Sequence, residues 1–231
     1  MTDNWAVIPV RGLTESKTRL SGNLQGDKRR IFVEALLEDV LSSVVRSRVY
    51  GTIIVISSDE NVRTRVKSQG VSFVKQTSVG LNRAIEQTNR LALQKHTRSV
   101  TNVLGDIPLV NPEDFKEISS LGGASQRVVL APSLKGGTNV MLTSPPGVVS
   151  PSYGRWSYSK HLHQAQLRGV NAYSMSNSRI SFDIDTTSDL IELRRRDPEG
   201  RTASGRVISE FGVLINDHGL SLSANSRSTH F

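Results

Sequence analysis

Short apolar segments alternate along this chain with segments whose apolar residues have helical spacing, and this alternation restricts the fold more than any other feature. Residues 52–57, with the sequence TIIVIS, are almost continuously apolar, which is typical of a strand buried on both faces of a sheet. Residues 28–47 instead place their apolar side chains on one helical face, formed by Val33, Leu36, Leu37, Val40 and Val44.

The same patterns predict further elements of both kinds. Strands are expected at residues 6–10, 71–75, 100–104, 127–131, 140–143 and 181–184. Helices are expected at 59–67, 80–94, from 111 onward, 156–168 and 188–196. Because strands that alternate with helices form parallel sheets with right-handed crossovers, we expect a doubly wound α/β fold.

The length of 231 residues fits one α/β domain with an appended tail. We place a single domain at residues 1–196 and a C-terminal extension at 197–231. The extension is expected to be partly helical, through an amphipathic stretch with Val207, Ile208, Phe211, Leu214 and Ile215. A serine-rich segment from Ser221 has the composition of a disordered tail.

Several structural classes are excluded by composition. The chain has no cysteine, so neither disulfides nor thiolate metal sites hold it together. No charged leader precedes an apolar run at the N-terminus, and no apolar stretch approaches the roughly 18 residues that a membrane span needs. We expect a soluble, cytoplasmic protein without a membrane partner.

The charge balance is basic, with 29 Lys and Arg against 21 Asp and Glu, a net charge of +8. Residues 11–30 and 60–98 carry most of the excess. Such runs usually form a solvated surface, but they also suit a phosphorylated small molecule or nucleic acid. Aromatic residues make up only 5% of the chain and no nucleic-acid-binding motif is present, so we expect no nucleic-acid partner.

Ligands of open α/β sheets bind beyond the carboxyl ends of the strands, which directs attention first to the loop after residue 10. This loop places Lys17 and Arg19 just past the first strand. It is poor in glycine and matches neither the Walker A pattern nor the dinucleotide fingerprint. Its basic residues are candidates for phosphate binding, with an ordinary exposed loop as the alternative.

Three aspartates are candidates for a metal site. Asp106 follows an apolar strand, and Pro108 prevents a helix from continuing there, so its carboxylate is held rigidly. Asp183 and Asp185 are two apart on a predicted strand and therefore point the same way, where a cation would relieve their repulsion. Mg²⁺ takes one or two carboxylates together with phosphates and water. The alternatives are an Asx turn at Asp106 and a helix cap at Asp185.

Two glycine-containing segments can approach an anion through backbone amides. These are residues 136–139 (GGTN), which can otherwise be an ordinary turn, and 153–157 (YGRWS), which can otherwise be a helix N-terminus with a packed tryptophan. His161 and His163 are two apart in a predicted helix and do not share a face. We therefore expect neither a histidine metal site nor a histidine catalytic base.

Taken in order, these segments resemble the 2-phospho-L-lactate guanylyltransferase family of coenzyme F-420 biosynthesis, whose bacterial relatives use phosphoenolpyruvate. The resemblance runs from residue 5 to about 195. It is carried by residues 7–11 (VIPVR) with 15–20 (ESKTRL), 80–84 (GLNRA), 104–109 (LGDIPL), 131–132 (AP) with 136–139 (GGTN), 153–157 (YGRWS) with 161–162 (HL), and 183–186 (DIDT) with 189–190 (DL). Ser133 stands where many relatives carry an acidic residue, and the tail beyond Arg196 is longer than in the family.

The resemblance implies a mixed, mainly parallel sheet of the nucleotide-diphospho-sugar-transferase type and a homodimer. It also implies that GTP and a small phosphorylated carboxylic acid give a guanylylated diphosphate ester and pyrophosphate. By the same analogy, Mg²⁺ would be bound by Asp106, Asp183 and Asp185. Nucleotide binding is assigned to Arg11, Lys17, Arg19, Gly80 and Asn82, with Lys17 and Arg19 also serving catalysis beside Asp106. Binding of the acid is assigned to Gly137, Thr138, Asn139, Gly154 and Ser157.

Other functions stay open at the level of sequence. The same fold can act on 3-phosphoglycerate, a sugar phosphate or a molybdenum-cofactor precursor, although the glycine-poor first loop disfavours the last two. A basic module that binds nucleic acid without catalysis belongs to a different class, which salt-dependent retention without pyrophosphate release would reveal. The sequence does not separate 2-phospho-L-lactate from phosphoenolpyruvate, because the two acids differ only in the saturation of one carbon.

Overall fold

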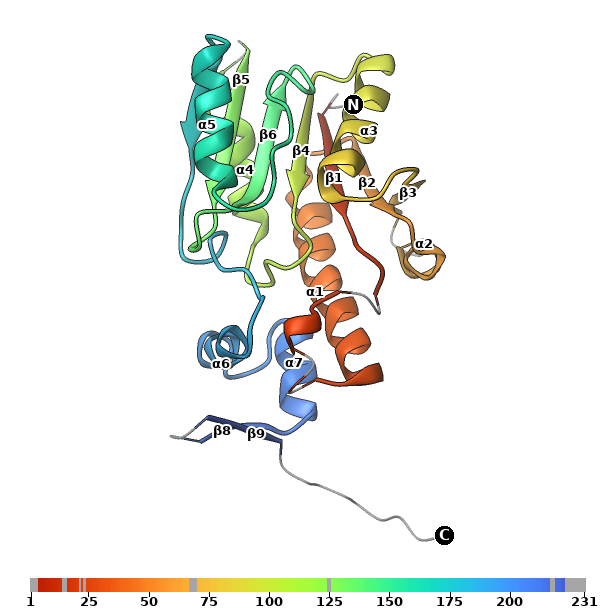
Figure 1. The fold of residues 1–231 in the computed structure, drawn as a ribbon, viewed down its shortest axis with the longest axis vertical. Helices are drawn as coiled ribbons and strands as arrows, with labels where there is room; N and C mark the ends of the chain where they lie inside the picture. The colour runs from red at the N-terminus through yellow and green to blue at the C-terminus, as the bar shows by residue number, and fades with distance from the viewer. Residues whose placement is uncertain are drawn as a thin grey trace, which may run out of the picture.

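The computed structural model of the chain describes residues 4–13, 16–20, 22, 24–66, 70–123, 126–216 and 219–222. Its centre is a sheet with the strand order β3-β2-β1-β4-β6-β5-β7 (Figure 1). The strands are β1 (Asn4–Pro9), β2 (Thr52–Ser57), β3 (Ser72–Lys75), β4 (Ser99–Val103), β5 (Arg127–Pro132), β6 (Thr138–Ser144) and β7 (Asn171–Ser174). β6 is antiparallel to β4 and β5, and the other neighbours are parallel. The expected mixed, mainly parallel sheet is confirmed.

Alternating residues of the central strands pack against helices on the two faces of the sheet. The helices are α1 (Gly26–Ser47), α2 (Glu60–Val66), α3 (Leu81–Gln94), α4 (Pro112–Ser120), α5 (Ser157–Leu167), α6 (Thr187–Arg196) and α7 (Ala203–Glu210). Ile8 and Val55 contribute to the core shared with α1 and α4, whereas Val7 and Ile54 pack with residues of α3. The continuous apolar character of β2 thus reflects burial on both sides.

A separate core lies beyond the carboxyl ends of the parallel strands, where α6 and α7 pack near α1 (Figure 1). Leu20 and Leu24 of the first loop, Phe182 and Ile184 before α6, and Ile208 of α7 are all fully or almost fully buried in it. The loop that carries Lys17 and the segment that carries Asp183 therefore rest on common apolar support.

Asp39 of α1 attaches α7 to this core. Its carboxylate accepts hydrogen bonds from the backbone N–H groups of Ala203 (2.6 Å) and Ser204 (3.0 Å) and from the Ser204 hydroxyl (2.6 Å). These are among the N–H groups that a helix leaves without internal partners at its N-terminus. The C-terminal extension is thus docked on the domain through a buried polar contact as well as apolar ones.

Most expected elements are found within a few residues of their predicted bounds, but the last strand is a correction. Residues 181–184 are not paired in the sheet, and instead Phe182 N–H donates to Arg179 O and Ile184 N–H to Asp106 O. The segment is apolar because Phe182 and Ile184 fill the core beside α6 and α7. The seventh strand is β7, which the sequence pattern misses because its side chains are mostly exposed at the sheet edge.

The C-terminal extension contains more strand than expected. α7 ends at Glu210, and Leu214 and Ile215 lie in β8 (Val213–Asn216), which pairs with β9 (Gly219–Leu222). β9 includes Ser221, where the disordered segment was expected to begin, and residues 223–231 of that segment lie outside the described residues. Within the described part of the chain, the helices are all too short or too polar to cross a membrane.

Candidate active site

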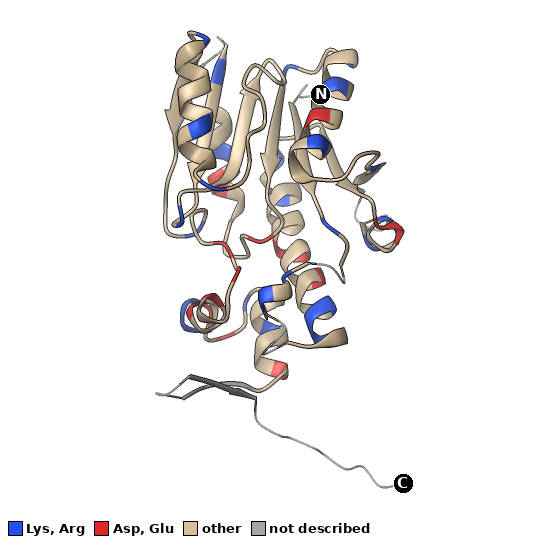
Figure 2. Ribbon diagram, in the orientation of Figure 1, with Lys and Arg blue, Asp and Glu red and all other residues tan. Residues whose placement is uncertain are grey.

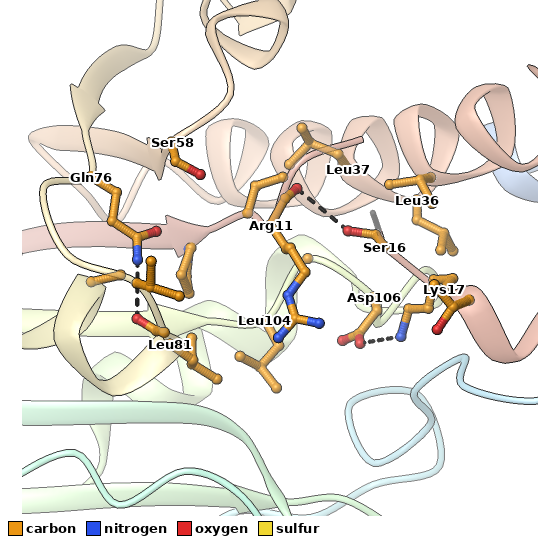
Figure 3. Close-up of a pocket in the computed structure, with 18 of the residues that line it drawn as sticks. Arg11, Ser16, Lys17, Leu36, Leu37, Ser58, Gln76, Leu81, Leu104 and Asp106 are labelled. Atoms are coloured by element: carbon orange, nitrogen blue, oxygen red, sulfur yellow. Dashed lines mark hydrogen bonds and ion pairs between the residues drawn. The ribbon is translucent and has the colours of Figure 1, made fainter. Parts of the chain in front are cut away.

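The loops beyond the carboxyl ends of β1, β2, β3 and β4 surround a cavity of about 900 Å³ (Figure 3). Its lining includes Arg11, Lys17, Arg19, Gly80, Asp106 and Asp185. This volume is within the usual range for small-molecule sites, and the position is the one at which open α/β sheets bind their ligands. The cavity therefore gathers residues from both ends of the predicted domain.

Asp106 stands in the turn that follows β4, as the sequence predicts. Its backbone carbonyl accepts a hydrogen bond from Ile184 N–H at 3.0 Å. This bond fixes the segment before α6 against the β4 turn, so that Asp183 and Asp185 flank the contact point. Figure 2 shows acidic residues on both of these neighbouring segments. The expected strand at Asp183 and Asp185 is wrong, but the Asp183 carboxylate still lies close to the carboxylates of Asp185 and Asp106.

Lys17 joins two of these aspartates. Its ammonium nitrogen lies 2.6 Å from Asp106 Oδ2 (Figure 3) and 2.9 Å from Asp185 Oδ1. Burial by itself would lower the pKa of Lys17, but the Asp106 and Asp185 carboxylates outweigh it and raise the pKa above its ordinary value. Lys17 is therefore a fixed cation at the centre of the carboxylate group.

The electrostatics of the aspartates show an excess of negative charge. Burial, together with the Asp106 and Asp185 carboxylates, raises the pKa of Asp183 to about 7. Burial opposes ionisation of Asp185 too, but Lys17 outweighs it and lowers the pKa of Asp185 to about 2. Asp106 Oδ1 is buried without a hydrogen-bond partner. An orphaned carboxylate oxygen beside two further carboxylates suits a hard cation, which would supply the missing contact.

The described residues do not, however, form a complete metal cage from side chains alone. Among them, no group of three or more His, Cys, Asp or Glu side chains is arranged to hold a metal ion. Mg²⁺ seldom uses an all-protein cage and usually takes one or two carboxylates plus substrate phosphates. The donor set is thus compatible with a cation that arrives with a phosphorylated ligand.

Lys135 is a site residue that the sequence reasoning missed. Its ammonium nitrogen lies 2.9 Å from Asp189 Oδ2 and 3.5 Å from Asp185 Oδ2. Asp189 also accepts from Thr186 N–H in a capping box, so Thr186, and not Asp185, is the N-cap of α6. Asp185 is thereby free of a capping role. The only sequence signal for Lys135 was its place in a loop after a strand.

Arg11 and Arg19, which the sequence analysis assigns to nucleotide binding, both line the cavity. The guanidinium of Arg11 points into the cavity between Gln76 and Asp106 (Figure 3). Asn82 lies elsewhere: its Oδ1 accepts from Tyr153 N–H at 2.8 Å and its Nδ2 is 3.4 Å from Tyr153 O. It lines a smaller cavity of about 420 Å³ with Gly80. Asn82 therefore connects the start of α3 to the loop before α5.

Thr138 and Ser157, assigned to the phosphorylated acid, form a buried cluster with His161. Thr138 Oγ1 lies 3.0 Å from His161 Nδ1 and 3.2 Å from Ser157 Oγ. Ser152 N–H donates to His161 Nε2 at 2.9 Å. Because Nε2 accepts this bond, the proton of the neutral ring is on Nδ1 and is donated to Thr138. Burial lowers the pKa of His161 to about 4, which keeps the ring neutral.

The other residues assigned to the acid are bound to the protein's own backbone and side chains. Gly137 N–H donates to Ser133 Oγ at 2.9 Å, and Asn139 Nδ2 donates to Ile180 O at 2.9 Å. Ser133 thus shapes the turn before β6, in keeping with its exclusion as a metal ligand. Gly154 lines the smaller cavity. β6, which carries Thr138, is next to β4 on the side away from β1, and Leu104 N–H bonds to Asn139 O at 3.0 Å.

The two cavities adjoin each other at the start of α3. The large cavity offers Arg11, Arg19 and Lys17 to a polyphosphate, and the smaller cavity shares Gly80 and Leu81 with it. His161 is not available as a base, since both of its ring nitrogens are bonded. The arrangement suits charge neutralisation and positioning more than proton transfer.

A family model described as "Guanylyl transferase CofC like" matches residues 4–202 of the chain. The phosphoenolpyruvate guanylyltransferase of Sphaerobacter thermophilus is 32% identical over 201 residues, which cover 86% of this chain and 96% of that protein. The 2-phospho-L-lactate guanylyltransferase of Methanothermobacter thermautotrophicus is 33% identical, over 81% of this chain and 82% of that protein.

Solved structures show the same fold at lower identity. A protein from Desulfovibrio desulfuricans assigned to the nucleotide-diphospho-sugar transferases superposes with a TM-score of 0.74 at 16% identity, covering 91% of this chain and 95% of that one. A nucleotidyl transferase from Methanothermobacter superposes with a TM-score of 0.60 at 16% identity, covering 84% and 96%. The expected fold type is confirmed.

Proposed function

Because this chain belongs to the CofC-like guanylyl transferase family, we propose that it transfers GMP from GTP to 2-phospho-L-lactate or phosphoenolpyruvate and releases pyrophosphate. The observation that carries the proposal is the meeting of Lys17 with Asp106 and Asp185, beside Asp183, at the wall of a cavity large enough for a nucleotide. Lys17, Asp106 and Asp185 come from three segments that are far apart in sequence.

Mg²⁺ is the proposed cofactor. Asp106, Asp183 and Asp185 would hold it, because Asp106 Oδ1 has no partner and the pKa of Asp183 is raised by burial and by its carboxylate neighbours. Phosphate oxygens of the substrates would complete its coordination. When bound, the ion would neutralise charge that develops on the transferred phosphate and on the leaving pyrophosphate.

The chain's own cations would bind the triphosphate. Arg11 and Arg19 line the cavity, and the carboxylates hold Lys17 at its wall. The phosphorylated acid would lie beside Thr138, Gly154 and Ser157, across the β4 turn from the triphosphate. Its phosphate oxygen attacks the α-phosphorus of GTP in line, a new P–O bond forms, and the bond to the pyrophosphate group breaks. The nucleophile is already an anion, so no general base is needed.

The role of the protein in this mechanism is to bring two anions together and to stabilise the transition state. Placing reactants in a near-attack geometry is worth about 7–11 kcal/mol of the barrier in favourable cases. His161 fixes the orientation of the Thr138 hydroxyl. Because His161 Nδ1–H donates to Thr138 Oγ1, the hydroxyl hydrogen of Thr138 points away from His161. Release of pyrophosphate supplies a direct signal for the reaction.

The test is a pyrophosphate-release assay with GTP or ATP against 2-phospho-L-lactate, phosphoenolpyruvate and 3-phosphoglycerate. We expect release with GTP and one of the first two acids, loss of release with EDTA, and recovery when Mg²⁺ is added in excess. Mass spectrometry should find the guanylylated diphosphate ester. Absence of pyrophosphate with GTP and every acid would reject the proposed reaction.

We also propose, on the family resemblance, that the protein is a homodimer. Separately, we propose that it is located in the cytoplasm. Sedimentation equilibrium would give twice the chain mass of 25.3 kDa for a dimer, and a single-chain mass would reject that assembly.

A further inference from the structure

The two ends of the large cavity differ in chemistry. One end contains Lys17, Asp106 and Asp185, which are charged. The other end is formed by Ser58, Gln76 and the loop up to Leu81, which are uncharged (Figure 3). Arg11 extends between them. A nucleoside triphosphate fits this polarity in one direction, with its phosphates toward Lys17 and its base toward Gln76.

The side-chain amide of Gln76 has a fixed orientation. Its Nε2 donates to the backbone carbonyls of Ser78 and, at 3.1 Å, of Gly80. Both partners are acceptors, so the nitrogen must be the atom that faces them, and Oε1 is turned the other way. In Figure 3 this oxygen points toward the interior of the cavity, on the side of Arg11. It has no hydrogen-bond partner among the described residues.

The loop that orients Gln76 is itself held from the other side. Gln87 of α3 accepts from Thr77 N–H at 3.0 Å and donates to Lys75 O at 2.9 Å. The Gln76 backbone N–H is bonded to Ser57 O at 2.9 Å. Gln76 Oε1 is therefore a preorganised acceptor, and a ligand does not need to order the loop in order to meet it.

A preorganised acceptor selects a base that presents donors. The Watson–Crick edge of guanine carries N1–H and a 2-amino group, both donors. Adenine in the same orientation presents an acceptor at N1, which would face Oε1 with a repulsive contact, and its 6-amino donor takes the position of the guanine O6, away from Oε1. Hypoxanthine keeps N1–H but lacks the 2-amino group. The Ser58 hydroxyl, which also lines this end, can donate to an acceptor such as the guanine O6.

We propose that Gln76 is a specificity-determining residue that accepts a hydrogen bond from the N1–H and 2-amino edge of the guanine of GTP. This inference rests on the proposed function and assigns the base subsite to the neutral end of the cavity. A site built to bond an N–H group rejects analogues that lack it, because the protein acceptor is then left unpaired. The expected order of affinity is GTP, then ITP, then ATP.

The experiment is isothermal titration calorimetry of the full chain with GTP, ITP and ATP in the presence of Mg²⁺ and without the acid. Gln76→Met removes the acceptor at similar volume, and the ratio of GTP to ATP affinity should fall about tenfold, as for the loss of one hydrogen bond. Gln87→Met is the matched control, since it removes the other tether of the same loop but does not line the cavity. It should lower all three affinities alike.

The outcomes separate the inference from the proposed function. Two outcomes would refute the inference but leave nucleotidyl transfer standing: equal binding of GTP and ATP by the wild-type protein, or a loss of both affinities by the same factor in Gln76→Met. In either case Gln76 only tethers the loop. If the wild-type protein binds no nucleotide, the proposed function fails and the inference fails with it. A fall in the ratio with Gln76→Met but not with Gln87→Met supports it.

Discussion

The replacement Asp106→Asn tests the carboxylate group directly, because it removes one negative charge and keeps the shape of the side chain. Asp106 Oδ2 lies 2.6 Å from Lys17 Nζ, and Oδ1 is buried without a partner. We expect turnover to fall much more than the affinity for GTP, since the proposed work of this carboxylate is done in the transition state.

The size of the effect follows from the charge lost. A unit-charge contact near 4 Å at an effective dielectric of about 20 is worth roughly 4 kcal/mol, or about a thousandfold in rate. Asp183 and Asp185 remain in the variant and supply part of the negative charge, so a thousandfold loss of rate is an upper limit. We expect a decrease in kcat of at least about a hundredfold, which is the usual size of one electrostatic contribution to catalysis.

The fold should survive this replacement. Lys17 keeps Asp185 at 2.9 Å, and Asp183 loses a negative neighbour. We expect the thermal unfolding midpoint to change by less than about 4 °C, corresponding to about 1 kcal/mol in a chain of this size. Asp27→Asn is the matched control, because its side chain is 86% exposed and its pair with Arg30 is on the surface. Its kcat should equal that of the wild type.

The assay is steady-state pyrophosphate release with Mg²⁺, with the acid that proves active, at several GTP concentrations. Thermal unfolding followed by circular dichroism confirms that the variants are folded. A folded Asp106→Asn protein with a kcat within about threefold of the wild type would show that less than about 1 kcal/mol depends on this carboxylate. That result would remove Asp106 from the proposed metal site and the mechanism built on it.

Three further replacements test other parts of the structure. Lys17→Ala should raise the KM for GTP at least about tenfold, the equivalent of one charge-assisted contact, and an unchanged KM would contradict its role with the triphosphate. Ile208→Ala should lower the unfolding free energy by about 2–5 kcal/mol, because the side chain is fully buried behind Leu20 and Leu24. Urea denaturation measures it, with the partly exposed Ile31→Ala as control. Burial lowers the pKa of His161 from 6.5 to about 4. The neutral ring therefore contributes up to ~3 kcal/mol to the unfolding free energy above about pH 6.5, and this contribution is lost as the pH falls through 4. The stability gap between wild type and His161→Gln should therefore narrow between pH 7 and 4, and a constant gap would refute the assignment.

Local patterns in the sequence determined the elements that frame the site. The run of residues 52–57 and the apolar face of residues 28–47 identified β2 and α1, because strand and helix periodicities depend only on near neighbours. The same information placed Asp106 at a strand end and Lys17 in the loop after β1. For a parallel sheet, strand order then brings such ends to one edge, so the cavity was predictable before its geometry was known.

Contacts between residues distant in sequence decided the features of the site that local patterns did not predict. Residues 182–184 have the apolar pattern of a strand, but Phe182 and Ile184 are buried against α6 and α7, and the backbone of Ile184 bonds to Asp106. The roles of Lys135 and Gln76 could not be predicted, because they depend on partners that folding brings close. Lys135 pairs with Asp185 and Asp189, and Gln76 bonds to two loop carbonyls. Periodicity records which side chains are buried, but not which distant groups they meet. Such contacts depend on three-dimensional packing, so only the tertiary structure determines them.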